Sequence, residues 1–325
     1  MMGRVIWPRG SVRWLGWLLL LLLVAIGGCR TGHPPAASDR DAQFSGQRAL
    51  SAARALAELS SAPPKGPSRR GEGEAFRWIE DQLKGIGAEL RSPENTDSSA
   101  EPSALGLPVF GILPGRSQDV FLLAATCCAK SDSASPGDRV ALDSASGAAV
   151  VLELGRALQH RDRPFTIWLA FMPDPPDPGW TARRGLSAVL SREPLRLAVF
   201  FQSLAWPGLR VLRDLHSQGV HREAFWESAR ALDLDAVFVQ SAPFASPPGP
   251  HRLLLEQDFR PVVALFGEPG APTETAESEA QRLDEFGQVV LNALDRIAAR
   301  LQSIDEFRGE VPNSSLPEER SERLD

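Results

Sequence analysis

The sequence predicts a three-layer α/β domain in which helices cover both faces of one mixed, mostly parallel sheet. Short apolar runs bounded by Pro, Gly and polar clusters alternate with longer segments whose apolar residues recur at helical spacing. Parallel strands need a crossover between them, so this alternation is typical of strand–helix–strand units. The chain has 325 residues, of which 43% are hydrophobic, and this is enough to fill a large core.

Five segments have the apolar spacing of amphipathic helices. The second is followed by Gly85 and Gly87, which accept the left-handed conformation of a helix cap. The predicted helices span residues 45–60, 72–84, 148–159, 224–234 and 281–307.

Six short apolar runs have the length and flanking turn residues of buried strands. No internal repeat connects them. The predicted strands span residues 105–113, 120–127, 165–172, 196–204, 236–240 and 262–267.

The N-terminus has the pattern of an export signal. Arg4, Arg9 and Arg13 precede an apolar stretch over residues 15–28, with no acidic residue before it. This stretch is shorter than the roughly 20 residues that a membrane-spanning helix needs. It ends in small residues followed by Cys29, and this resembles the lipobox of bacterial lipoproteins, in which the cysteine thiol carries the lipid. The alternatives are a plain signal peptide or an anchor helix, with Cys29 unmodified.

Lipid on Cys29 implies a protein of the cell envelope that is anchored to a membrane and faces the periplasm or the cell surface. Arg30 follows the cysteine, and in a host with two membranes this resembles sorting to the outer membrane. The predicted organisation is a signal peptide over 1–28, a lipidated cysteine and flexible tether over 29–44, a folded domain over 45–308 and a disordered tail over 309–325.

Charge and cysteine content exclude two classes of protein. The formal net charge is −6 and the pI is near 5.5, with Lys and Arg scattered, so we expect no nucleic-acid partner. Besides Cys29, the cysteines are the adjacent Cys127 and Cys128, which lack the spacing of a disulfide framework. The fold must therefore depend on its apolar core.

The most distinctive motif is Asp143-Ser144-Ala145-Ser146-Gly147 running into the predicted helix. An acid at this place would cap the helix or hold a cation. The order of segments around it resembles the zinc exopeptidase family, which has a phosphorylase/hydrolase-like fold. That family includes secreted aminopeptidases, glutaminyl cyclases and the non-catalytic transferrin receptor ectodomain. The resemblance covers residues 53–190 well and the remainder loosely.

The resemblance implies a zinc site that this chain retains only in part. Asp143 matches a metal-binding aspartate of the family, and Glu274 lies in the loop that carries the family's closing histidine. Thr126 and Cys128 stand where the family has a His-x-Asp motif. A Cys128 thiolate could bind zinc, whereas the alternative is a buried, unreactive cysteine.

The family's paired acids are also altered. When the motifs are registered on Trp180, Asp174 takes the general-base position and Pro175 the ligand position. Registered on the strand, prolines take both positions, and a proline side chain has no metal-binding atom. Farther on, Gln202 stands where the family has an acid, and His251 falls where the cyclases carry another.

These replacements predict a domain that has lost most of its metal ligands and acts as a non-catalytic binding or assembly module. Its partners would be the membrane, through the lipid, and peptides or envelope proteins, and no cofactor is expected. The alternative is a live aminopeptidase or glutaminyl cyclase with a reshaped zinc site. A third hypothesis is that the old cleft still binds peptide N-termini without cutting them.

Overall fold

The structure is a computed structural model, and it describes residues 42–61, 70–91, 108–127, 139–173, 193–270 and 276–310. The chain divides into two compact units, Met1–Arg40 and Asp41–Asp325, and every described residue belongs to the second. No helix within the described residues is both long and apolar enough to cross a membrane.

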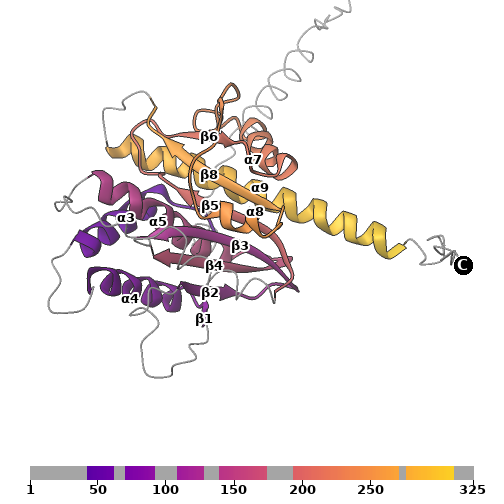
Figure 1. The fold of residues 1–325 in the computed structure, drawn as a ribbon, viewed down its shortest axis with the longest axis horizontal. Coiled ribbons are helices and arrows are strands. Elements are labelled where there is room, and N and C mark those ends of the chain that lie inside the picture. Colours follow the sequence, from indigo (N-terminus) through magenta and orange to yellow (C-terminus); the bar gives the residue numbers. More distant parts are fainter. Residues whose placement is uncertain are drawn as a thin grey trace, which may run out of the picture. The chain divides into compact units, whose positions relative to one another are not determined.

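Eight strands form a single sheet in the order β1-β2-β4-β3-β5-β8-β6-β7 (Figure 1). The four central strands β4, β3, β5 and β8 run parallel, whereas β2 and β6 pair antiparallel with β4 and β8. The strands are β1 Glu89–Arg91, β2 Val109–Leu113, β3 Ser117–Cys127, β4 Phe165–Pro173, β5 Leu195–Gln202, β6 Arg210–Asp214, β7 Phe244–Ala245 and β8 Val262–Glu268.

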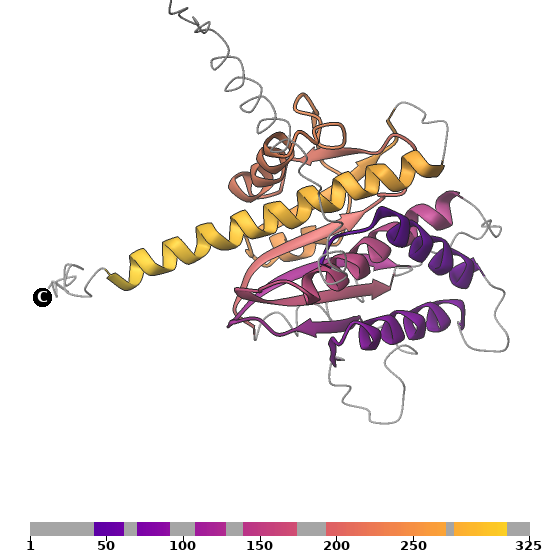
Figure 2. The same ribbon diagram turned by 180° about the vertical axis from the view of Figure 1, so that it is seen from behind.

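Helices pack on both faces of this sheet. Alternate residues of β3 belong to two separate core clusters, with Phe121 and Leu123 in one and Val120 and Leu122 in the other. Most helices contribute to the first cluster, and α9 crosses that face (Figure 2), whereas Leu254 of α8 belongs to the second. The helices are α3 Gly46–Ser61, α4 Arg70–Gly85, α5 Arg139–Gln159, α7 Gly219–Ala231, α8 His251–Glu256 and α9 Ala276–Glu310. The predicted layered α/β architecture is confirmed.

The prediction of a strand over 236–240 is wrong. These residues form turns, although Val237 and Phe238 are fully buried. The ring of Phe238 lies edge-on to Trp226, with centroids 5.3 Å apart, and stacks on Phe286 at 5.5 Å. The apolar character of residues 236–240 therefore reflects their burial beneath α7 and α9. The strand in this part of the chain is β6, which the sequence analysis missed together with β1, β7 and α8.

Helix α5 begins nine residues before its predicted start, at Arg139. Ala141 and Ala145 face the core, and the hydroxyl of Ser146 donates to the carbonyl of Asp143 at 2.6 Å, a bond within the helix that satisfies the serine. Asp143 is therefore inside the helix, and the prediction that it lies just ahead of the helix is wrong.

Candidate functional site

The carboxyl ends of the parallel strands meet at one edge of the sheet, here called the carboxyl edge. Cys127, Pro173, Gln202 and Glu268 are the last residues of β3, β4, β5 and β8. Open α/β sheets bind their ligands outside this edge. The described polar residues nearest to it come from the end of β5 and from the beginnings of α5 and α8.

Asp143 lies beside Ser203, the first residue after β5. The Ser203 side chain hydrogen-bonds the carboxylate, and Arg139 lies near enough to attract it, but burial outweighs both and raises the pKa of Asp143 above its ordinary value. The Oδ1 atom is buried and has no hydrogen-bond partner among the described residues. Ser203 itself has a φ of 56°, a conformation that few residues other than glycine adopt.

Close packing holds α5 against the end of β5. A Cβ atom on Gly147 would lie 2.3 Å from the carbonyl oxygen of Phe201, so only glycine fits there. One turn away, the Ser146 hydroxyl accepts a hydrogen bond from the Leu204 backbone N–H at 2.8 Å. These contacts place Asp143 directly over the turn that contains Ser203.

Gln202 and His251 approach one another across Gly249. A Cβ atom on Gly249 would lie 2.5 Å from Oε1 of Gln202 and 2.8 Å from Nδ1 of His251. The imidazole is fully buried at the start of α8, and its ring centroid lies 6.3 Å from that of Phe200. The glutamine amide and the imidazole therefore replace two carboxylates that the family resemblance implies here.

His251 faces a second buried group, the carboxylate of Asp214 at the end of β6. Nε2 of His251 lies 3.9 Å from Oδ2 of Asp214, too far for a direct hydrogen bond. Oδ2 instead accepts from the hydroxyl of Ser217 at 2.7 Å, and that oxygen accepts from the Ala264 N–H at 2.8 Å. Burial lowers the pKa of His251, and the attraction of Asp214 opposes that effect only in part, while Arg252 adds to it.

Of the residues predicted for the site, only Asp143 can be placed. Cys29, Cys128, Asp174 and Glu274 lie outside the described residues. The predictions for these four residues therefore stay predictions.

Two further groups are buried. His221 is in α7 with 6% of its surface exposed, and burial lowers its pKa. Cys127, the last residue of β3, is buried and disulfide-bonded.

Zinc is the metal that the fold implies, and protein zinc sites use three or four ligands. Within the residues that the structure describes, no group of three or more His, Cys, Asp or Glu side chains could hold a metal ion. The orphaned Oδ1 of Asp143 is a single candidate oxygen, and the groups that act on this carboxylate are the Ser203 hydroxyl and the cationic Arg139, neither of which is a zinc ligand of the usual kind. The described residues alone therefore do not fit a zinc ion.

The sequence analysis missed the contact of Asp143 with Ser203 and the buried contacts of Asp214 with His251 and Ser217. Asp214 ends a strand whose sequence, Arg-Val-Leu-Arg-Asp, is too polar to stand out as a strand. Its contact with His251 joins two segments 37 residues apart, and no local pattern signals that pairing.

Several solved structures have a fold similar to that of this chain. No protein-family model matches the chain, and no curated protein sequence matches it. A glutaminyl cyclase from an Acidobacteriales bacterium aligns with a TM-score of 0.63 and 19% identity, over 82% of this chain and 97% of its own. The Porphyromonas gingivalis glutaminyl cyclase aligns with a TM-score of 0.57 and 18% identity, over 78% of this chain and 98% of its own.

A Zn-dependent exopeptidase from Parabacteroides distasonis is also similar, with a TM-score of 0.59 and 16% identity over 77% of this chain and 97% of its own. Identities this low show the fold alone. The chain therefore has the α/β fold of bacterial glutaminyl cyclases and Zn-dependent exopeptidases.

Proposed function

We propose that this chain is a membrane-anchored lipoprotein whose cyclase-like domain does not catalyse a zinc-dependent reaction and instead binds peptides or envelope proteins. Lipid on Cys29 would hold it at the cell envelope, in the outer membrane if the host has two membranes, facing the periplasm or the cell surface. The disulfide at Cys127 supports an oxidising compartment.

The observation that carries the non-catalytic part of the proposal is the environment of Asp143. This residue matches a zinc ligand of the family, yet its carboxylate sits within a helix, bonds to Ser203 and has a raised pKa. The prolines at 175 and 176 remove a second ligand from the sequence.

The anchoring part is tested with the full-length protein expressed in a bacterial host. Radiolabelled palmitate should enter the wild-type protein, which should sediment with membranes, whereas Cys29→Ser should carry no label and leave the membrane fraction. Label-free wild-type protein would contradict lipidation.

The catalytic part is tested on the same purified protein. Zinc content is measured beside the cyclisation of N-terminal glutamine and the hydrolysis of aminoacyl substrates, with an active bacterial glutaminyl cyclase as the positive control. We expect neither stoichiometric zinc nor turnover. Stoichiometric zinc that is lost in Asp143→Ala, together with turnover, would establish the alternative, an active enzyme. The orphaned Oδ1 of Asp143 is the observation that favours that alternative.

Ligand binding needs an assay that does not depend on catalysis. Peptide arrays with varied N-termini, probed in the presence of EDTA, test whether the carboxyl edge still binds chain ends. Binding that survives the chelator supports the proposal. If peptides bind only with zinc present, the domain is a metalloprotein and the proposal fails.

A further inference from the structure

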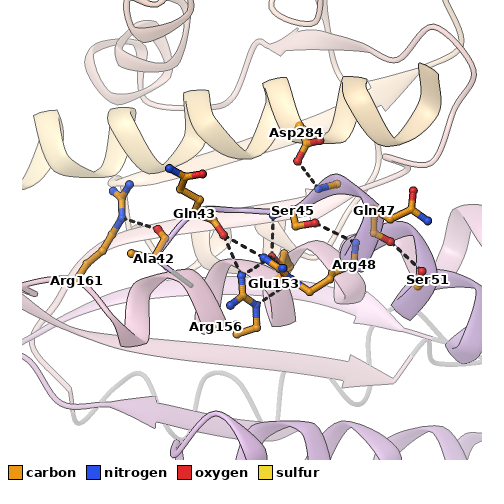
Figure 3. Close-up of polar contacts among 11 residues, drawn as sticks. Ala42, Gln43, Ser45, Gln47, Arg48, Ser51, Glu153, Arg156, Arg161 and Asp284 are labelled. Atoms are coloured by element: carbon orange, nitrogen blue, oxygen red, sulfur yellow. Dashed lines mark hydrogen bonds and ion pairs between the residues drawn. The ribbon is translucent and has the colours of Figure 1, made fainter. Parts of the chain in front are cut away.

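The chain enters the folded domain through a short segment, residues 42–46, here called the junction. The Nε atom of Arg161 donates to the carbonyl of Ala42 at 3.2 Å, and the Nη2 atom of Arg156 donates to that of Gln43 at 2.9 Å. The backbone N–H of Ser45 donates to Oε1 of Glu153 at 2.7 Å (Figure 3). Followed backwards, the junction therefore runs along α5 towards the end of that helix.

The junction is also fastened to α9. Phe44 is 4% exposed, and a Cβ atom on Gly287 would lie 2.1 Å from its ring. The ring therefore packs directly against the backbone of Gly287, where a larger residue would leave it no room. The backbone N–H of Gly46 donates to Oδ1 of Asp284 at 2.6 Å (Figure 3). Contacts on both sides fix the position of the junction on the domain.

This point lies at the opposite edge of the sheet from the candidate site. The end of α5 leads directly into β4, and backbone bonds from Arg116 to Arg163 and from Ser117 to Pro164 join that turn to the start of β3. These residues form the amino edge of the parallel strands. Asp143 lies near the other end of α5, and the 16 residues from there to Gln159 rise about 24 Å along the helix.

We propose that the amino edge of the sheet faces the membrane and that the carboxyl edge, with Asp143, Ser203 and His251, faces away from it. This inference rests on the proposed lipid at Cys29. The segment between that cysteine and the junction has 12 residues, 30–41. A chain of that length would span about 20 Å on average if it were a random coil and about 40 Å at full extension. Turning the carboxyl edge to the bilayer would require the chain to run back along the roughly 24 Å of α5, which exceeds this average span.

The charges at the amino edge do not by themselves select a lipid. Arg116 pairs with Asp162 at 3.2 Å, and Arg161 pairs with Asp295 at 3.0 Å. Arg196 is paired with Asp119 and Asp305 in the same way. Because these guanidinium groups already have carboxylate partners, the junction and the short tether set the orientation, with little contribution from anionic headgroups. The edge fits a polar bilayer surface of either charge.

This orientation narrows the kind of partner that the proposed function allows. A carboxyl edge that points away from the bilayer is open to folded envelope proteins and long peptides. An edge that pointed at the bilayer would admit only ligands small enough to enter the gap.

The experiment uses the full-length lipidated protein in vesicles, with a donor fluorophore on an unnatural residue at one of the two ends of α5. Val140 is 56% exposed at the beginning of the helix, and His160 is exposed just after its end. The acceptor is attached to lipid headgroups. We expect energy transfer from position 160 to exceed that from position 140 by about two-fold or more, because 20 helical residues separate the labels by about 30 Å.

Three further samples sharpen the result. Neutral and anionic vesicles should give the same ratio, and Arg116→Glu should leave it unchanged. Insertion of about 20 Gly and Ser residues after Arg40 should reduce the ratio, because the average span of a flexible chain grows about 1.6-fold when its length increases from 12 to roughly 32 residues. Equal or reversed transfer, or a ratio that the insertion does not alter, overturns the inference. Failure to float with vesicles, with no lipid in the intact mass, overturns the proposed anchoring instead.

Discussion

The imidazole of His251 and the carboxylate of Asp214 lie 3.9 Å apart inside the protein, and neither side chain is exposed to solvent. Arg252 and His216 also act on the imidazole, and both disfavour its protonation. Burial, Arg252 and His216 together lower the pKa of His251 below its ordinary value, against the attraction of Asp214.

We expect the free energy of unfolding to fall as the pH is lowered through about 6.5, the ordinary pKa of histidine. The folded state lowers the pKa of His251, so its contribution is fully present above the unfolded pKa and is lost as the pH falls towards the folded one. In urea unfolding, His251→Gln should reduce the slope of the unfolding free energy against pH by at most about 1.4 kcal/mol per pH unit. His160→Gln, at an exposed position, is the control and should not change it.

The sign of the stability change caused by Asp143→Asn distinguishes the proposed function from the alternative, an active zinc enzyme. The folded state raises the pKa of Asp143, so its contribution is present below the unfolded pKa of 3.8 and is lost as the pH rises through the folded pKa. At neutral pH the variant should therefore be as stable as the wild type or more stable. A bound zinc ion would give the opposite result, because the variant would lose metal-linked stability. Thermal unfolding with and without EDTA measures the difference.

Glu153→Ala should destabilise the domain. The carboxylate is 5% exposed and accepts from the Ser45 N–H, Arg48 and Arg156, so its removal leaves these partly buried donors without their acceptor. We expect a loss of about 1–3 kcal/mol. Asp81→Ala is the matched control, because Asp81 is 72% exposed and pairs only with exposed Lys84, a bond of about 0–1 kcal/mol. Similar urea midpoints for the two variants would show that Glu153 is not structural.

Gly147→Ala tests the approach of α5 to β5. The new Cβ atom would meet the Phe201 carbonyl oxygen at 2.3 Å, so helix or strand must move, and we expect a loss of roughly 1–3 kcal/mol or more. Gly73→Ala is the control in α4, where nothing lies within 4 Å. There the helix should gain about 0.5–1 kcal/mol. A neutral effect at Gly147 would contradict the packing described.

If Cys29 carries lipid, the disulfide partner of Cys127 can be predicted. The chain has three cysteines, so the partner is Cys29 or Cys128. A lipidated Cys29 has no thiol to offer, and we expect a Cys127–Cys128 link and no free thiol in the non-reduced protein. Alkylation followed by peptide mass mapping checks this, with reduced protein as the control. A link to Cys29 would contradict lipidation at that residue.

The sequence was sufficient for the parts of the fold that have strong patterns. The runs that became β3, β4 and β8 are nearly continuous apolar segments, as parallel strands buried on both faces require. The helical spacing of apolar residues likewise predicted the position of α9. By contrast, Val237 and Phe238 have the composition of a strand but are buried in turns, because their neighbours in space, Trp226 and Phe286, decide their conformation.

The candidate site was predictable only where a motif is local. Asp143 stands out by its neighbours in sequence, but its environment depends on Ser203 and that of the nearby Ser146 depends on Leu204, each about 60 residues away. The pairing of His251 with Asp214 depends on where α8 and β6 fold. Such contacts between distant segments have no signature in a single sequence.

The junction also determines how the domain bears mechanical load. A pull on the N-terminal side acts at Ala42 along the axis of α5, so it shears the bonds of Ala42, Gln43 and Ser45 together. The seat of Phe44 on Gly287 resists the same displacement. Tension from the proposed lipid anchor would therefore act on these contacts before it acts on the sheet.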